Sequence, residues 1–134
     1  MDRTLYDTIF AIATETRAWV QAKADKSDYH ADDLNCWCAI ASGELHKRLV
    51  KAGIDSKIHM WNDWGCHCYC VVEDHVVDVT ATQFKPYRDV PVLILHCKEA
   101  YHEFHQGSLV FDSARALRTH QKNTRWPSQQ IAYA

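Results

Sequence analysis

Cysteine and histidine side chains gather in one short stretch of the chain, WGCHCYC at residues 64–70. Thiolate sulfur and imidazole nitrogen are good metal ligands, and a thiol beside an imidazole is also the pair used in nucleophilic catalysis. A third use of clustered cysteines is a disulfide framework. The spacing inside the stretch, and the chemistry available elsewhere in the chain, distinguish these three uses.

The stretch reads as a β-strand, in which successive side chains point to opposite faces. His67 therefore shares a face with Tyr69 and Val71, and the neighbouring cysteines face the other way. A compact metal site built from this stretch alone is geometrically awkward. Because free cysteine commonly packs as a small apolar residue, we expect mainly packing here. The cysteines concerned are Cys66, Cys68 and Cys70.

A separate cysteine, Cys38, stands where a helix is predicted to begin. Residues 38–52 repeat apolar or small side chains with helical spacing, and Gly53 follows as the expected left-handed stop. The start of a helix presents unpaired N–H groups and a partial positive charge, which favour a thiolate and can bind a developing oxyanion. Close packing of this helix on a sheet would bring a strand histidine within reach, and His67 is the best candidate.

An aspartate completes the candidate site. Residues 67–73 and 76–84 alternate and are separated only by Asp74 and His75, which predicts an antiparallel hairpin. A turn at these two residues places Asp78 across from Val71, two pleat steps from His67, and a small register shift changes that offset. A carboxylate in a half-buried strand is reasonable when it accepts a hydrogen bond from an imidazole. We therefore predict a catalytic triad of Cys38, His67 and Asp78.

The rest of the chain predicts the elements that hold these residues in place. The predicted order is helix then sheet, which indicates one α+β domain over residues 1–134, with N-terminal helices packed on a small antiparallel sheet. The further predictions are an amphipathic helix at 4–24, a polar loop at 24–33, strands at 56–61 and 90–97, an ambiguous polar stretch after residue 97 and a short helix at 112–122.

The composition of the chain limits the classes of partner and the cellular compartment that we expect. The chain has 134 residues, 15 basic and 17 acidic, with a net charge of −2, so it lacks the basic stripe that phosphate neutralisation requires. Nucleic acid is a poor first guess as partner. The N-terminal residues read neither as a signal peptide nor as a membrane span, and we expect a cytoplasmic protein without disulfides.

Two segments, CAIASGELHKRLVKAGI from residue 38 and GCHCYCVVEDHVVDVTATQF from residue 65, resemble the core of the transglutaminase-like and papain-like cysteine hydrolase superfamily. The resemblance covers about residues 34–84. It implies a papain/transglutaminase-like core in which Cys38 is the nucleophile, His67 the general base and then acid, and Asp78 the orienting residue. The implied reaction is acyl transfer from an amide or ester through a thioester, on a protein or peptide substrate, without cofactor or metal.

The nucleophile and the oxyanion donor have alternatives within this resemblance. Cys36 precedes Trp37 and mimics the Cys-Trp pair of papain-like enzymes, so it competes with Cys38. We favour Cys38 because the small residues after it and its distance to Gly53 fit the helix of the family better. The backbone N–H of Cys38 is the expected oxyanion donor, with Asn35 as a candidate side chain.

Two other classes of function stay open. One is a zinc-binding thiol and imidazole module, which lacks the paired C-x-x-C spacing of well-defined zinc sites; the other is a catalytically inactive binding protein of the same fold. The residues of the zinc module would be Cys36, Cys38, Cys66 or Cys68 with His67 or His96. Trp61, Trp64 and Trp126 suit a substrate groove or a contact surface, and YHEFHQG at 101–107 reads as a solvated loop. The substrate, the acceptor and the oligomeric state are not predicted.

Overall fold

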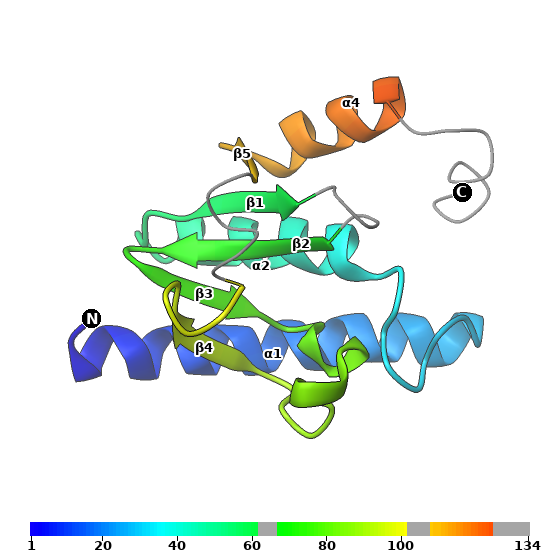
Figure 1. Cartoon of the computed structure of the whole chain (residues 1–134), viewed down its shortest axis with the longest axis horizontal. Coiled ribbons are helices and arrows are strands. Elements are labelled where there is room, and N and C mark those ends of the chain that lie inside the picture. The colour runs from blue at the N-terminus through cyan, green and yellow to red at the C-terminus, as the bar shows by residue number, and fades with distance from the viewer. Residues whose placement is uncertain (62–66, 102–107, 125–134) are drawn as a thin grey trace.

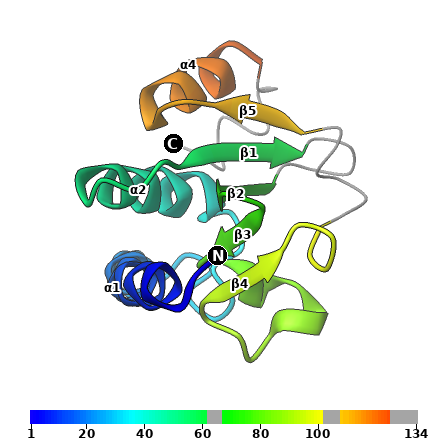
Figure 2. The same ribbon diagram turned by 90° about the vertical axis from the view of Figure 1, so that its left-hand side faces the viewer.

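A computed structural model describes residues 1–61, 67–101 and 108–124. Within these residues the chain forms three α-helices and one five-stranded antiparallel sheet, with strand order β4-β3-β2-β1-β5 (Figure 1). Helices α1 and α2 cover one side of the sheet, and α4 lies beside β5 at its edge (Figure 2). The α+β prediction, with N-terminal helices on an antiparallel sheet, is confirmed.

The elements have the following bounds: α1 Arg3–Ser27, α2 Cys38–Lys51, β1 Lys57–Trp61, β2 His67–Val72, β3 His75–Asp78, β4 Leu93–His96, β5 Leu109–Phe111 and α4 Ala114–Thr124. Two short 3₁₀ turns, η1 Ala81–Gln83 and η2 Lys85–Tyr87, lie between β3 and β4. The helix predicted at 4–24 continues for one further turn. It ends at Asp28, whose φ of 56° is left-handed and breaks the helix.

Helix α2 begins and ends where its sequence predicts. Gly53 has a φ of +80°, and the N–H of Ile54 donates to the carbonyl oxygen of Leu49 at 3.0 Å. This is the hydrogen bond of a helix stop built on a left-handed glycine. The stop redirects the chain into β1, so α2 and the central strands lie against each other.

The hairpin between β2 and β3 corrects the predicted register. Val72 pairs with His75 and Val71 with Val76, so the two-residue turn is Glu73–Asp74 and not Asp74–His75. Glu73 takes the positive φ, 53°, that such a turn requires. Asp78 of β3 is therefore not opposite Val71. Its position across the hairpin is one pleat step nearer to the start of β2, where His67 lies.

One further prediction needs correction, and one segment left ambiguous by the sequence is now assigned. The strand expected over 76–84 stops at Asp78, because the chain after it turns into η1. The stretch after residue 97 contains β5, which adds an edge strand beside β1, with His59 opposite Val110. Two of the three β5 residues are exposed, so the strand lacks the alternating pattern that reveals a half-buried strand in a sequence.

The core is divided by the sheet. On the helical side, residues of α1 and α2 pack with Cys68, Cys70 and Val72 of β2. On the other side, Tyr69 packs with Trp61 and Val76. The predicted alternation of β2, with Cys68 and Cys70 packing on the face opposite Tyr69, is confirmed for the described residues; Cys66 lies outside them.

Candidate active site

The candidate nucleophile Cys38 is the first residue of α2 and is only 2% exposed. The loop before it is tightly bonded: the indole Nε1 of Trp37 donates to Tyr29 O at 2.6 Å, and the hydroxyl of Thr82 donates to Asp33 O at 3.1 Å. Cys36 has a φ of 73°, a left-handed conformation that favours glycine. The loop thus delivers the chain into α2 with the Cys38 thiol facing the sheet.

His67 is the first residue of β2 and is also 2% exposed. Its Nε2 donates to Oδ2 of Asp78 at 2.6 Å, a short charge-assisted hydrogen bond. The corrected register explains this contact, because it places Asp78 on the same face of the sheet as His67 and diagonally across the hairpin. The predicted pairing of these two residues is present in the structure.

Asp78 is fully bonded although it is 1% exposed. Oδ1 accepts from the backbone N–H of Thr80 at 2.8 Å and from its hydroxyl at 3.2 Å. Oδ2 accepts from His67 and, at 2.8 Å, from the hydroxyl of Tyr101. Four donors therefore compensate for the burial of the carboxylate.

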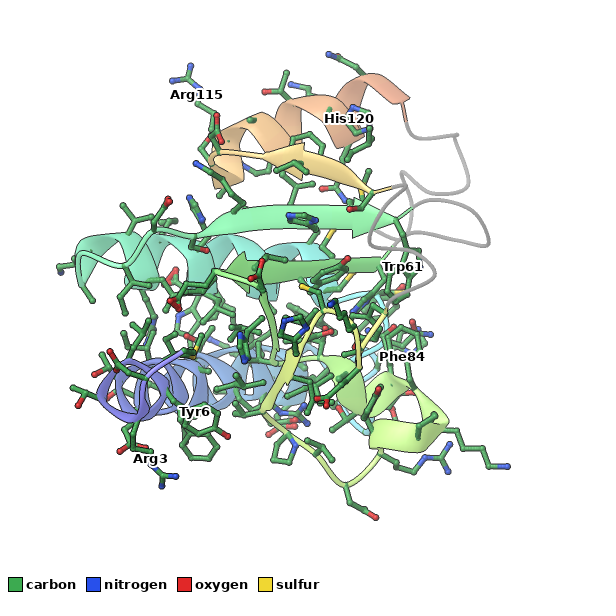
Figure 3. The ribbon with its side chains drawn as sticks, turned by 60° about the vertical axis from the view of Figure 1, so that its left-hand side comes forward. Arg3, Tyr6, Trp61, Phe84, Arg115 and His120 are labelled. Atoms are coloured by element: carbon green, nitrogen blue, oxygen red, sulfur yellow. The ribbon has the colours of Figure 1, made fainter. Side chains whose placement is uncertain are left out.

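Aromatic rings enclose the imidazole of His67. The ring centroids of Trp61 and Phe84 lie 4.8 Å and 4.7 Å from that of His67, and Tyr101 lies at 5.6 Å. Trp61 and Phe84 lie near each other at one end of the sheet (Figure 3). These rings exclude water, so charges in the site act through a low dielectric.

The pKa values of the Cys38 thiol and the His67 imidazole are shifted in opposite directions, and each shift favours the charged form. The pKa of Cys38 lies well below its ordinary value because Cys68 donates hydrogen bonds to it from its thiol and its backbone N–H, and because His67 adds a hydrogen bond and a positive charge; burial opposes this shift. Burial also lowers the pKa of His67, but Asp78 and Cys38 outweigh it and raise the pKa to about 10. Both shifts in pKa favour the charged forms, a thiolate at Cys38 and an imidazolium at His67.

The carboxylate remains charged beside that pair. Burial raises the pKa of Asp78, yet the charge and hydrogen bond of His67, with the donors of Thr80 and Tyr101, bring it below its ordinary value. Three charges, negative, positive and negative, thus follow one another from Cys38 to Asp78. This is the arrangement in which a thiolate is ready to attack an electrophile and the imidazolium is ready to give up a proton.

The two competing residues of the preceding loop have other surroundings. Cys36 is half-buried, and its hydrogen-bond partner is the side chain of Tyr29, whereas Cys38 bonds to His67. Asn35 is exposed, and its backbone N–H donates to Asp33 at 2.9 Å. The geometry therefore favours Cys38 as the candidate nucleophile, and the hydrogen bond described for Asn35 goes to Asp33.

Four residues of the site were not predicted from the sequence: Cys68 as a donor to Cys38, Thr80 and Tyr101 as donors to Asp78, and Gln83 beside His67. The motif VVDVTATQF held a signal for one of them, Thr80, since a threonine two residues after an aspartate often bonds back to it. Tyr101 was assigned to a solvated loop and is instead in the aromatic cluster; residues 102–107 of that loop lie outside the described residues.

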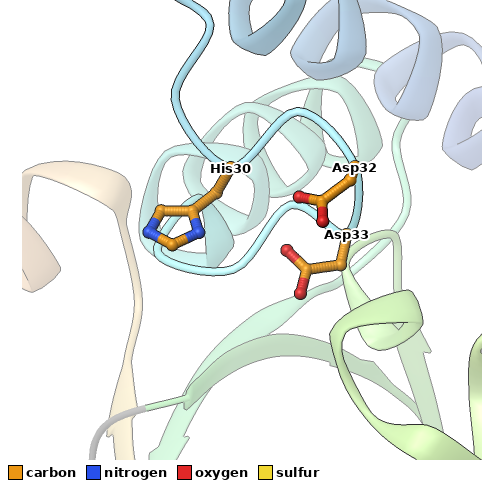
Figure 4. Close-up of side chains that lie close together, drawn as sticks. All are labelled: His30, Asp32 and Asp33. Carbon is orange, nitrogen blue, oxygen red and sulfur yellow. The ribbon is translucent and has the colours of Figure 1, made fainter.

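The described residues contain one group of side chains close enough together to share a metal ion, His30, Asp32 and Asp33 (Figure 4). It includes no residue of the predicted zinc module. Two of its three side chains are exposed, and Asp33 is already bonded to the N–H of Asn35. His96 pairs with His75 at the turn end of β3, and Asp78 lies at the other end of that strand.

Comparison with known proteins adds no assignment, because no family model, curated protein or solved structure matches this chain. Among the described residues, no helix has the length and apolar character needed to cross a membrane.

Proposed function

We propose that the protein is a cysteine-dependent acyl-transfer enzyme that acts on an amide or ester of a protein or peptide. The observation that carries this proposal is the buried chain of contacts from Cys38 through His67 to Asp78, with the pKa of the thiol lowered and that of the imidazole raised. The order of the three residues, at a helix start and on two paired strands, agrees with the resemblance to transglutaminase-like and papain-like hydrolases.

The proposed reaction has two half-reactions, in which His67 first donates a proton and then accepts one. The Cys38 thiolate attacks the carbonyl carbon, and the proton on His67 passes to the leaving nitrogen or oxygen as its bond to carbon breaks. The products of this half-reaction are a thioester on Cys38 and a neutral imidazole. His67 then takes a proton from water or an amine as it attacks the thioester, which returns the enzyme to the ion pair. Asp78 holds the ring in the tautomer that both steps require.

Setting and partners are part of the same proposal. The protein acts in a reducing, cytoplasmic environment that keeps Cys38 reduced, and it has no nucleic-acid partner. The five described cysteines, Cys36, Cys38, Cys68, Cys70 and Cys97, are all free thiols, which supports this setting.

The test is a mass-spectrometric map of iodoacetamide labelling near neutral pH and at low reagent concentration. We expect Cys38 to label faster than every other cysteine, and His67→Ala to slow it because the thiolate loses its positive partner. His96→Ala is the matched control and should leave the rate unchanged, because His96 lies on β4 opposite His75, at the end of β3 away from Asp78. Uniform slow labelling of the thiols would contradict the proposal and favour an inactive binding protein.

A further inference from the structure

Cys68 brings a second thiol to the sulfur of Cys38. The two residues lie on facing elements, Cys38 at the start of α2 and Cys68 one residue after the start of β2. The thiol and the backbone N–H of Cys68 both donate a hydrogen bond to Cys38. Both residues belong to the core on the helical side of the sheet, where Cys38 is 2% and Cys68 0% exposed. The candidate nucleophile therefore has a thiol as its direct neighbour.

This contact is part of a regular alignment of α2 with β2. One helical turn after Cys38, the carbonyl oxygen of Ser42 accepts a hydrogen bond from Sγ of Cys70 at 3.3 Å. Four residues of a helix rise about 6 Å and two residues of a strand rise about 6.6 Å. The step from Cys38 to Ser42 therefore nearly equals the step from Cys68 to Cys70. Because the whole helix packs on the strand in this way, Cys68 is held beside Cys38.

A thiolate that contacts a second thiol is the arrangement of a redox-sensitive cysteine pair. Peroxides react with thiolates, and the hydrogen bond and positive charge of His67 favour the thiolate at Cys38. Two other buried thiols have the opposite preference, since burial raises the pKa of Cys70 to about 12 and raises the pKa of Cys97 as well. A peroxide should therefore react at Cys38 before it reacts at these two, and it does so within reach of Cys68.

We propose that Cys38 and Cys68 form a redox switch, in which a peroxide converts the two thiols into a disulfide bond between α2 and β2. The disulfide removes the thiolate of Cys38, and a reducing thiol opens the bond again by exchange. Formation of the disulfide does not need acyl transfer, whereas the loss of acyl transfer that accompanies it rests on the proposed function. The oxidised protein is thus a reversible, inactive state.

The oxidation has two steps. The sulfur of Cys38 attacks one oxygen of hydrogen peroxide, the O–O bond breaks, and the other oxygen leaves as water with the proton of His67. Cys38 is then a sulfenic acid, and the peroxide has taken up the two electrons that the sulfur lost. The sulfur of Cys68 next attacks that of Cys38, the S–O bond breaks, and the departing hydroxide takes the thiol proton of Cys68. One peroxide thus gives one disulfide and two molecules of water, and His67 is left neutral.

The test is a map of the cysteines after oxidation. The reduced protein is treated with hydrogen peroxide at neutral pH, the remaining thiols are blocked with iodoacetamide, and the protein is digested without reduction for mass spectrometry. We expect two peptides joined through Cys38 and Cys68, lighter by two hydrogen atoms than the free pair, which separate when dithiothreitol is added. Fragmentation of the joined peptides assigns the two bonded cysteines.

Two variants separate the partner thiol from its neighbours. Cys68→Ser keeps a hydrogen-bond donor beside Cys38 and removes the second thiol. In this variant Cys38 should stop at the sulfenic acid, which dimedone traps, and excess peroxide should carry it to the sulfinic acid, which dithiothreitol does not reverse. Cys70→Ser is the matched control, because it changes the next thiol on the same face of β2. It should form the same disulfide as wild type.

Each other outcome has a distinct meaning. If iodoacetamide labels Cys38 quickly but peroxide takes it to the sulfinic acid in wild type, with Cys68 still a free thiol, the switch is overturned and the proposed function stands. A disulfide between Cys38 and any other cysteine also overturns the switch. If Cys38 reacts slowly with both reagents, the switch and the proposed function fail together. The map of wild type alone gives these results, so a variant that does not fold leaves the test decisive.

Discussion

The two faces of strand β2 show how one short sequence serves two kinds of packing. On the helical face, Cys68, Cys70 and Val72 meet the small and aliphatic residues of α1 and α2. On the other face, His67 and Tyr69 lie among aromatic rings and a buried carboxylate. The helical face is held mainly by shape and burial, and the aromatic face holds charges through a complete set of hydrogen bonds.

Thiol chemistry differs accordingly between the faces. Burial raises the pKa of Cys70 to about 12, and its Sγ donates to Ser42 O at 3.3 Å. Cys38, which contacts both Cys68 and His67 where the two faces meet, has its pKa lowered. Depth in the core does not separate the two thiols, since both are almost fully buried. What separates them is the presence of a cation and of donors beside the sulfur.

The largest expected effect comes from removing the carboxylate of the aromatic face. Asp78→Ala leaves three buried donors without an acceptor and an imidazolium without its countercharge, so we expect a loss of about 3–5 kcal/mol in the free energy of unfolding, measured with urea. Ser42→Ala changes a residue equally buried on the helical face and should cost within about 1 kcal/mol. Similar losses in the two variants would contradict the contrast between the faces.

The second prediction concerns the pH dependence of stability. With a folded pKa of about 10 and an unfolded value near 6.5, His67 contributes stability that is complete below pH 6.5 and is lost as the pH rises toward 10. Cys38 has a lowered folded pKa, so its contribution is present above its unfolded value of about 8.5 and is lost as the pH falls through the folded value. Over the pH range in which both groups are ionised in the folded protein and neutral in the unfolded chain, the two changes cancel, and this pair leaves the free energy of unfolding level.

Cys38→Ala removes one side of this balance. The contribution of His67, still raised by Asp78, then falls with rising pH by up to about 1.4 kcal/mol per pH unit above pH 6.5. Urea unfolding of wild type and variant at several pH values gives the difference directly. Cys70→Ala on the helical face should keep the wild-type profile. A level difference between wild type and Cys38→Ala across this range would show that the pair is not ionised.

The sequence predicted the elements whose patterns are strong and local. Helical spacing before Gly53 located α2 and its first residue, and alternation assigned Cys68 and Tyr69 to opposite faces of β2. The register was wrong because the turn was placed one residue late, and in a hairpin this moves every pairing by two residues. The correct turn needed Glu73 with a positive φ, which is an uncommon choice at that position.

Most contacts in the site could not be predicted from local sequence patterns. The hydroxyl of Tyr101 reaches Asp78 from 23 residues away in the chain, and Arg17 of α1 donates to Val79 O and to the Thr82 hydroxyl next to the site. Such partners depend on how separate elements pack, and neither residue type nor spacing specifies that packing. The three residues of the candidate triad could be predicted because each lies at one end of a well-patterned helix or strand.

The smallest expected effect tests whether the helical face also serves the site. Cys68 belongs to that face, yet its thiol and backbone N–H both donate to Cys38. Cys68→Ala keeps the backbone donor and removes the thiol, so the midpoint of the pH profile of Cys38 alkylation should move to higher pH. The accompanying loss of stability should be only about 1 kcal/mol, an ordinary value for a small change in the core.

Cys70→Ala is the matched control, because it removes the next thiol on the same face of the same strand. It should cost about as much stability and leave the midpoint unchanged, since the partner of Cys70 is Ser42 and not the nucleophile. Equal shifts in both variants would mean that the midpoint responds to packing in general. A shift in Cys68→Ala alone would show that the helical face supplies one specific donor, and that the reactivity of Cys38 depends on both sides of the sheet.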